Sequence, residues 1–249
     1  MWRKLLTGSL ALGVLLVLLG TAQAYHINFT YGANANYSYA EARHYTDYYT
    51  YVDDWDEQYA SGEALASAFK TSAEAEAYTR PIGWTDPICE VSGKVDENTT
   101  FYSYAYAYSD SWAEFKIAKD VGDTCDLVSV TFKFNATGGF NLDDGATSSY
   151  YYFLNVNGNE LYKVYDHYCA TGTHSDYFET TLNLPVDVTH NFQVVLDGDV
   201  DHTSTTENYA WYKADLDIVD IKCIPIPSAL LLLGSGLVGL TGLAWRRRG

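Results

Sequence analysis

The sequence is poor in basic residues, with 15 Lys and Arg side chains against 32 Asp and Glu. Five of the basic residues lie at positions 3, 4, 246, 247 and 248, so the chain between these ends carries 10 − 32 = −22 formal charges. Binding to a phosphate backbone needs a surface rich in Lys and Arg. The charge balance therefore excludes nucleic acid as a partner.

Motifs of the common catalytic and metal sites are also missing. The histidines show no H-x-x-x-H or H-E-x-x-H spacing, the four cysteines include no C-x-x-C pair, and no G-x-S-x-G segment occurs. Any two of the 32 acidic residues could be chosen as a glycosidase pair, so their number is no evidence for one. We predict a protein that is not an enzyme and holds no cofactor. The six histidines, expected at surfaces or turns, are His26, His44, His167, His174, His190 and His202.

A weak calcium candidate occurs at Asp197, Asp199 and Asp201, which resemble the first half of a calcium loop. An EF-hand would require a glycine and a glutamate where this chain has His202 and Asn208, so an EF-hand is excluded. Two interpretations stay open: looser calcium binding by an acidic turn, or a solvated turn without metal.

The first 24 residues have the organisation of a secretory signal peptide. A short basic start precedes an apolar run of 16 residues from Leu5 to Gly20. Ala22 and Ala24 then form the small-x-small pattern that signal peptidase cleaves. We expect cleavage before Tyr25 and export across the inner membrane.

The last 26 residues combine three elements. A proline motif, Ile224-Pro225-Ile226-Pro227-Ser228, precedes an apolar run of 17 residues from Ala229 to Trp245, and the basic residues Arg246, Arg247 and Arg248 follow. The run is just long enough to span a membrane as a helix, with the arginines in the cytosol. A plain C-terminal anchor and a sorting signal both fit this order.

This three-part order resembles the PEP-CTERM sorting domain of bacterial envelope proteins, in the subgroup whose motif is similar to Val-Pro-Leu-Pro-Ala. Ile226 stands where the eponymous motif has Glu. The resemblance implies an exosortase as processing partner and association with exopolysaccharide or biofilm. It also implies a location in the periplasm, on the outer surface or in the extracellular matrix, with at least transient anchoring by the C-terminal helix.

Residues 25–223 are dominated by alternation of period two, which is typical of β-strands. In 101–108 four tyrosines alternate with Ser and Ala, and in 127–134 Val and Phe alternate with polar residues. We predict an all-β fold, an antiparallel, jelly-roll-like β-sandwich, between the signal peptide (1–24) and the sorting segment (224–249). Further strands are expected within 36–52, 150–156, 160–165, 177–184, 190–196 and 209–221, with turns at 137–139, 143–145, 157–159 and 197–199.

One segment, 63–78, carries two conflicting patterns. It is rich in Ala and Glu, which favour helices, and Leu65, Ala68 and Phe69 have helical spacing. Its second half alternates strictly between Ala and larger polar residues. We predict a strand.

The four cysteines, Cys89, Cys125, Cys169 and Cys223, all lie in the part expected to be exported. An even number of cysteines in an oxidising compartment predicts a disulfide framework. The three pairings that four cysteines allow stay open, with neighbours in sequence as one of them. We expect no free thiol.

Tyrosine is unusually frequent, at 23 of 249 residues. A tyrosine ring stacks on sugar rings and also packs in cross-strand pairs, so two functions remain. The first is an envelope or matrix protein whose tyrosines stabilise the sheets, and the second is a carbohydrate-binding module. An open row of aromatic side chains on one sheet face would favour the second. The candidate rows are Tyr45, Tyr48, Tyr49, Tyr51, Trp55 and Tyr59, and Tyr150, Tyr151 and Tyr152.

Overall fold

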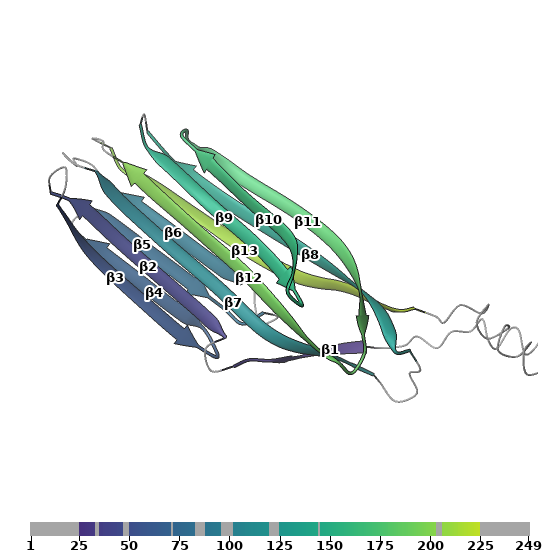
Figure 1. Ribbon diagram of the computed structural model, residues 1–249. Helices are drawn as coiled ribbons and strands as arrows, with labels where there is room; N and C mark the ends of the chain where they lie inside the picture. The colour runs from purple at the N-terminus through teal and green to yellow at the C-terminus, as the bar shows by residue number, and fades with distance from the viewer. Residues whose placement is uncertain are drawn as a thin grey trace, which may run out of the picture.

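The computed structural model describes residues 25–32, 35–46, 50–70, 72–82, 88–95, 102–119, 125–143, 145–202 and 206–224. Within these ranges every regular element is a β-strand, and the strands stack as two antiparallel sheets (Figure 1). The prediction of an all-β antiparallel sandwich is confirmed. None of the described segments forms a helix that could cross a membrane. The predicted cleavage residues Ala22 and Ala24 and the run 229–245 lie outside the described residues.

Sheet A has seven strands and sheet B has six. The order in sheet A is β10-β9-β12-β7-β2-β3, with β1 paired to the C-terminal part of β7. Its strands are β1 (Tyr25–Thr30), β2 (Asn36–Tyr45), β3 (Tyr51–Ala60), β7 (Ser103–Lys119), β9 (Thr147–Val156), β10 (Asn159–Tyr168) and β12 (Thr189–His202). The order in sheet B is β11-β8-β13-β6-β5-β4. Its strands are β4 (Ala64–Lys70), β5 (Ala73–Thr79), β6 (Cys89–Val95), β8 (Leu127–Asn141), β11 (Gly172–Pro185) and β13 (Asn208–Cys223).

Eight of the strands form nested antiparallel pairs. β6 pairs with β13, β7 with β12, β8 with β11, and β9 with β10, and the pairs alternate between sheets B and A. The pairs β2–β3 and β4–β5 extend the two sheets at one side. The segment 63–78, which was predicted as a strand from the alternation in its second half, forms two strands, β4 and most of β5.

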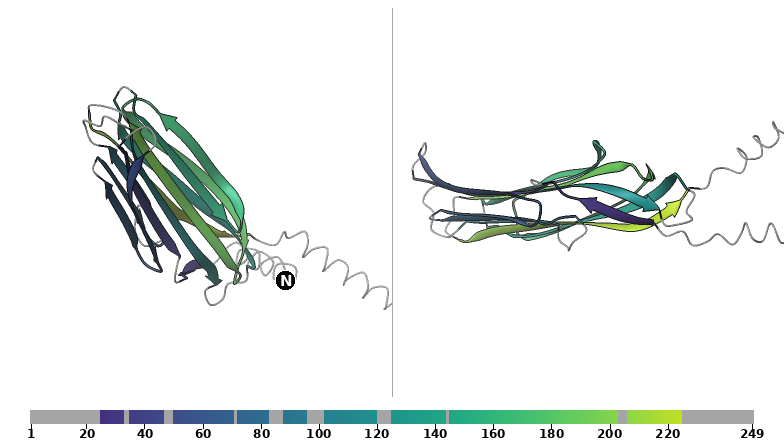
Figure 2. Two further views of the ribbon diagram at one scale, coloured as in Figure 1. Left: turned by 60° about the vertical axis from the view of Figure 1, so that its left-hand side comes forward. Right: turned by 90° about the horizontal axis from the view of Figure 1, so that it is seen from below.

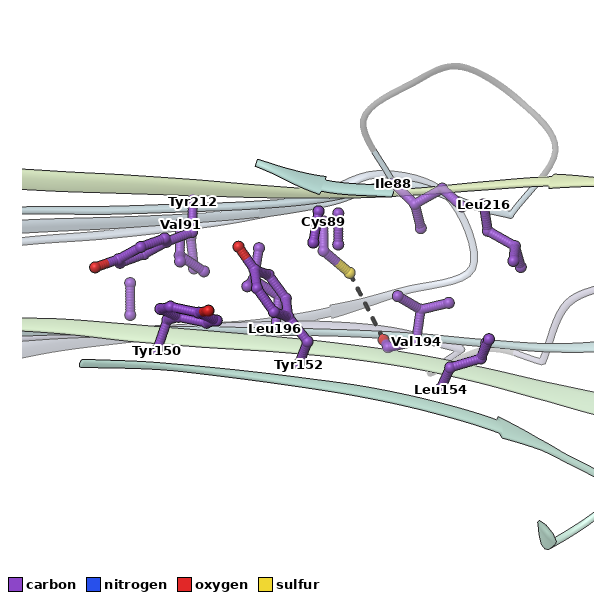
Figure 3. Packing of buried hydrophobic residues seen from close by; sticks show 14 of the residues in the cluster. Ile88, Cys89, Val91, Tyr150, Tyr152, Leu154, Val194, Leu196, Tyr212 and Leu216 are labelled. Carbon is purple, nitrogen blue, oxygen red and sulfur yellow. Dashed lines mark hydrogen bonds between the residues drawn. The ribbon is translucent and has the colours of Figure 1, made fainter. Parts of the chain in front are cut away.

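The core between the sheets changes in side-chain size along the molecule. Around β8, β9, β12 and β13 it contains large buried side chains (Figure 3). Around β2, β4, β5 and β7 it consists mainly of alanines, and the sheets approach so closely that a Cβ on Gly93 would lie 3.2 Å from that of Ala105. The large buried side chains include Phe132, Phe134, Tyr150, Tyr152, Phe192 and Tyr212.

Short hydroxyl side chains connect the two sheets in the alanine-rich half. Thr79 of β5 lies 2.8 Å from the Ser38 hydroxyl of β2 and 2.7 Å from the Ser109 hydroxyl of β7. Its hydroxyl also donates to the carbonyl of Tyr37. Buried hydroxyls that are bonded in this way avoid the free-energy cost of unsatisfied polar groups. The inner positions of β2 and β7 in this half are Ser and Ala over 38–42 and 103–113.

Side chains of β3 cover β4, which is one of the two edge strands of sheet B. The backbone N–H groups of Leu65, Ser67 and Phe69 in β4 donate to Gln58, Asp56 and Asp54, respectively, at 2.6, 3.1 and 3.1 Å. Unpaired N–H groups on an edge strand would otherwise be open to pairing with another chain.

The described chain begins and ends at the same end of the sandwich (Figure 2). Tyr25 pairs with Lys119 of β7, and Cys223 forms a disulfide with Cys125 just beyond that strand. The N–H of Ile224 donates to the carbonyl of Leu127 at 3.1 Å. The last strand is therefore fastened to the sandwich immediately before the proline motif.

The prediction that all four cysteines are bridged is wrong. Only Cys125 and Cys223 are bonded, whereas Cys89 is a buried free thiol and Cys169 an exposed one. Cys89 points into the core and donates weakly to the carbonyl of Val194 at 3.6 Å (Figure 3). Cys169 follows β10 at the surface.

Two of the predicted turns lie inside strands. Gly138 and Gly139 belong to β8, where a Cβ would lie 2.3 Å from the ring of Tyr212 and 2.8 Å from that of Trp211, respectively. Gly198 belongs to β12, where a Cβ would lie 2.7 Å from the ring of Tyr212. These glycines make room for aromatic rings. The turn at Asn157-Gly158 is confirmed, with φ of 53° and 76°, as expected for a tight hairpin.

Candidate functional site

The outer face of sheet A carries the tyrosines of β7. Ser103, Ala105 and Ala107 point inward and are fully buried, so the alternating residues Tyr104, Tyr106 and Tyr108 point outward and are half-buried. A sheet usually places its large apolar side chains inward and its polar ones outward. β7 does the opposite over this stretch, so large aromatic surface faces solvent.

Neighbouring strands extend this aromatic surface on both sides. Tyr39 of β2 pairs with Tyr108, and its ring centroid lies 6.1 Å from that of Tyr106. Tyr37 lies 5.7 Å from Tyr108 and stacks on Tyr59 of β3 at 4.4 Å. The rings therefore form cross-strand contacts and a continuous open surface at once. Other exposed rings at the β2–β3 edge are Tyr51 and Trp55.

Three carboxylates lie beside the tyrosines of β7, on the central strand β12. Asp197 pairs with Tyr108, Asp199 with Tyr106, and Asp201 with Tyr104. On their other side lies β9, where Tyr151 pairs with Asp197. The surface formed by the following residues is called the Tyr–Asp face: Tyr37, Tyr39, Tyr104, Tyr106, Tyr108, Tyr151, Asp197, Asp199 and Asp201 (strands β2, β7, β12 and β9 in Figure 1).

Asp199 and Asp201 receive donors from neighbouring strands. Asp199 accepts hydrogen bonds from the backbone N–H and the hydroxyl of Ser149, both at 2.8 Å. Asp201 accepts from the hydroxyls of Thr147 at 2.6 Å and Tyr102 at 3.0 Å. Both carboxylates are therefore held in fixed positions.

Asp197 has the most perturbed carboxyl of the three. Burial, and then the charge of Asp199, raise its pKa to about 7, and a hydrogen bond from Tyr106 lowers it only partly. Burial also raises the pKa of Asp199, which two hydrogen bonds from Ser149 oppose. Carboxyls with perturbed pKa values occur at functional sites more often than elsewhere, because burial and neighbouring like charges are arranged there to shift them. Asp199 and Asp201 each accept two hydrogen bonds from neighbouring strands, whereas Asp197 accepts one from Tyr106, so Asp197 has the most acceptor capacity left for a ligand.

The tyrosine hydroxyls remain donors at neutral pH. Burial and the charges of Asp197 and Asp199 raise the pKa of Tyr106 above its usual value. Burial likewise raises the pKa of Tyr104 and Tyr108. The face therefore offers flat apolar rings, hydroxyl donors and carboxylate acceptors on one open surface. This combination suits a polyhydroxyl ligand, whose C–H faces stack on aromatic rings while its hydroxyls donate to carboxylates.

The acidic segment proposed as a calcium turn is part of this face. Asp197, Asp199 and Asp201 are alternate residues of β12. Alternate residues of a strand lie about 6.7 Å apart, which spreads their carboxylates along the strand. Within the described residues, no group of three or more His, Cys, Asp and Glu side chains could hold a metal ion. The prediction of a turn is wrong, because Gly198 serves the packing of Tyr212.

The two predicted aromatic rows are placed differently. Tyr45, Tyr51, Trp55 and Tyr59 are on β2 and β3, with Trp55 58% exposed, whereas Tyr48 and Tyr49 lie outside the described residues. In the second row only Tyr151 faces outward. Tyr150 and Tyr152 are buried in the core (Figure 3), so their assignment to a sugar-binding face is wrong.

Sequence reasoning missed that the face depends on β12 lying between β7 and β9. The alternation of Asp197, Asp199 and Asp201 is itself a strand pattern, and Gly198 obscured it. The proline motif Ile224–Ser228 and Arg246, Arg247 and Arg248 remain predictions, since beyond Ile224 they lie outside the described residues.

Comparisons with known proteins give little further information. No protein-family model and no curated protein matches the chain. Among solved structures, the chain is similar to TmCBM61 in complex with β-1,4-galactotriose, with a TM-score of 0.27 and 10% identity over 63% of this chain and 88% of that one. It is also similar to the enzymatically active domain of bacteriophage CBA120 tailspike protein 4, with a TM-score of 0.23 and 10% identity over 64% of this chain and 20% of that one. These TM-scores are too low to carry an argument about function.

Proposed function

We propose that this is a non-enzymatic, exported protein of the cell envelope or extracellular matrix that binds polysaccharide through the Tyr–Asp face. The ectodomain is a jelly-roll-like sandwich, which the nested strand pairs support. The C-terminal segment directs sorting by an exosortase. The observation that carries the binding proposal is the row of outward tyrosines on β7 beside the carboxylates of β12.

The composition of this face is costly for a sheet that has only a structural role. Asp is among the residues that disfavour strands, and successive acidic residues on one face repel each other. The pKa of Asp197 is raised because burial and the charge of Asp199 make its ionised form unfavourable in the folded protein. A ligand that donates hydroxyl groups to the carboxylates would explain why such a row is kept on a central strand.

The charge of the face also limits the ligand. Tyr104, Tyr106 and Tyr108 are flanked by three carboxylates of β12 on one side. On the other side lies Glu41 of β2, whose charge is balanced by an ion pair with Arg43, so the net charge beside the rings is negative. Like charges brought together at an interface oppose binding. A neutral polysaccharide is therefore favoured over one rich in uronic acids.

The binding proposal is tested by affinity electrophoresis of the full chain in mild detergent, through gels that contain hydroxyethyl cellulose, galactan, dextran or polygalacturonate. We expect at least one neutral polymer to retard the wild-type chain and polygalacturonate not to retard it. Tyr106→Ala should weaken the retardation at least fivefold, because it removes the central ring of the face. The matched control Tyr177→Ala removes a 56% exposed tyrosine on β11 in sheet B and should behave as wild type.

Equal retardation of the Tyr106→Ala and Tyr177→Ala variants would contradict binding at the Tyr–Asp face. Release of reducing sugar from the retarding polymer would contradict the non-enzymatic part of the proposal, since two carboxylates on one face could then be acting as a glycosidase pair.

The sorting proposal is tested by replacing Pro225 and Pro227 with Ala in the native host. One tag is placed in the ectodomain and a second after Gly249. We expect the wild-type chain to lose the second tag and the double variant to accumulate as an uncut membrane form. A plain anchor needs only the apolar run and its arginines, so equal retention of both tags in the two proteins would contradict sorting.

A further inference from the structure

A hollow of about 610 Å³ lies on the outer face of sheet B, on the opposite side of the sandwich from the Tyr–Asp face. Two cross-strand rows form its floor, one of Leu65, Tyr78 and Glu90 and one that includes Glu76 and Ser92. Sites for small ligands typically measure about 300–1,000 Å³. The hollow is therefore large enough for one or two sugar rings.

The polar groups of the hollow are already oriented by neighbouring cations. Arg80 lies over the ring of Tyr78 at 3.9 Å and within 3.9 Å of both Glu63 and Glu90. Lys213 of β13 lies 2.8 Å from Glu90. Two cations thus face the three glutamates of the hollow, Glu63, Glu76 and Glu90. The hollow has an excess of acceptors and a surplus of negative charge, which favours a ligand rich in hydroxyl donors and disfavours an anion.

An aromatic ring continues this surface beyond the hollow. Trp211 of β13 pairs with Ser92, which lines the hollow. A Cβ on Gly139 of the adjacent strand β8 would lie 2.8–3.0 Å from three atoms of the indole. The indole therefore lies across Gly139, half-buried at the surface of the sheet. The indole thus lies over β8, two strands from Glu90 on β6, and Lys213 Nζ, which is bonded to Glu90, lies 5.6 Å from the centroid of the indole. A flat ring connected in this way to the acceptors of the hollow is an arrangement on which a sugar ring can stack.

We propose that the hollow and Trp211 form a second saccharide site, for a neutral polysaccharide, on the face opposite the first. One sugar ring stacks on Trp211, and the same saccharide chain extends across β13 into the hollow, where its hydroxyls donate to Glu76 and Glu90. This inference rests on the proposed function of the Tyr–Asp face. A molecule with one site on each of two opposite faces can join two polysaccharide strands, because each site engages a different strand.

The test uses the full chain in mild detergent with hydroxyethyl cellulose, galactan and dextran. Oligosaccharides prepared from each polymer are titrated calorimetrically to count sites, and dynamic light scattering follows cross-linking of the intact polymer. The sheet B variants are Glu76→Ala, which alters an exposed side chain, and Glu76→Ala combined with Trp211→Ala. Glu74→Ala is the matched control, because Glu74 is an exposed residue of the same face of β5 that does not line the hollow.

We expect two sites per wild-type chain and growth of light scattering with the polymer. The double variant should show one site and no scattering growth, Glu76→Ala alone should weaken one site at least threefold, and Glu74→Ala should match wild type. A single site in wild type that Tyr106→Ala abolishes would overturn the sheet B site and leave the proposed function intact. Unchanged stoichiometry in the double variant would also overturn it. If wild type binds none of the three polymers, the proposed function fails, and the second site fails with it.

Discussion

Replacing Asp197 with Asn should stabilise the protein at neutral pH, even though it damages the Tyr–Asp face. The folded state raises the pKa of this carboxyl from 3.8 to about 7. Folding therefore favours the protonated form, so Asp197 costs no stability below about pH 4. The cost grows as pH rises from about 4 to about 7, and it stays constant above that range.

The size of the effect follows from the pKa shift. A shift of one unit corresponds to about 1.4 kcal/mol, so the shift of Asp197 sets an upper limit of about 4 kcal/mol. The side chain is half-buried, and the solvent that reaches it screens the charge. We expect Asp197→Asn to raise the free energy of unfolding by about 1–2 kcal/mol at pH 8 and to leave it unchanged near pH 4.

The assay is urea unfolding of the full chain in mild detergent at pH 4, 5.5, 7 and 8.5, with the unfolding midpoint as readout. Asp217→Asn is the matched control, because it makes the same substitution at an exposed residue of β13 in the other sheet. An equal gain at every pH, or no gain at pH 8.5, would refute the argument that burial and Asp199 make this carboxylate costly.

Further predictions concern His202 and the cysteines. Burial lowers the pKa of His202, so the neutral imidazole costs no free energy of unfolding above about pH 6.5, and stability is lost as pH falls below that value. His202→Leu should therefore lose less stability than wild type between pH 7 and pH 5. Parallel losses in the two proteins would count against a buried neutral imidazole. The Cys125–Cys223 bridge has a sequence separation of 98 residues, so its reduction should lower the free energy of unfolding by about 4–5 kcal/mol. We expect a large drop in melting temperature on reduction, and an unchanged melting temperature would contradict the prediction. Iodoacetamide should label the exposed Cys169 in the native protein. It should label Cys89 only after unfolding in urea without reductant, because burial encloses this thiol and raises its pKa to about 12. A chain with no alkylated thiol in urea would instead contain a second bridge.

Much of the fold could be predicted because alternation of period two survives in nearly every strand. The alternation in 101–108 and 127–134 correctly separated inward from outward residues. In 63–78 the strict alternation of small and larger residues outweighed helix propensity, because the alanines fill a narrow space between close sheets. Pattern was the better guide here than propensity.

Glycine caused the errors of turn prediction. Gly138, Gly139 and Gly198 lie in strands because Tyr212 and Trp211 occupy the space where a side chain would stand. These contacts join residues 14 to 74 positions apart in sequence, and local sequence does not record them. The turn at Asn157-Gly158 was recognised because both residues need positive φ, which is a local requirement.

The site was only partly predictable for the same reason. The sequence placed the tyrosines of β7 on one face of a strand and the acidic residues of β12 in a turn, and it assigned the sugar-binding rows to other tyrosines. The adjacency of the two groups depends on the pairing of β7 with β12. Likewise, cysteine spacing could not show that Cys125 and Cys223 meet at one end of the sandwich while Cys89 is enclosed in the core. Pairing of distant segments is a property of the whole fold.

The central claim is that the Tyr–Asp face binds a polysaccharide, and the most direct measurement is a crystal structure with an oligosaccharide from the polymer that retards the chain. We predict a sugar ring stacked on Tyr106 or Tyr108, with a hydroxyl donating to Asp197 at hydrogen-bond distance. An oligosaccharide bound elsewhere, with the outer face of β7 and β12 unoccupied at saturating concentration, would contradict the account.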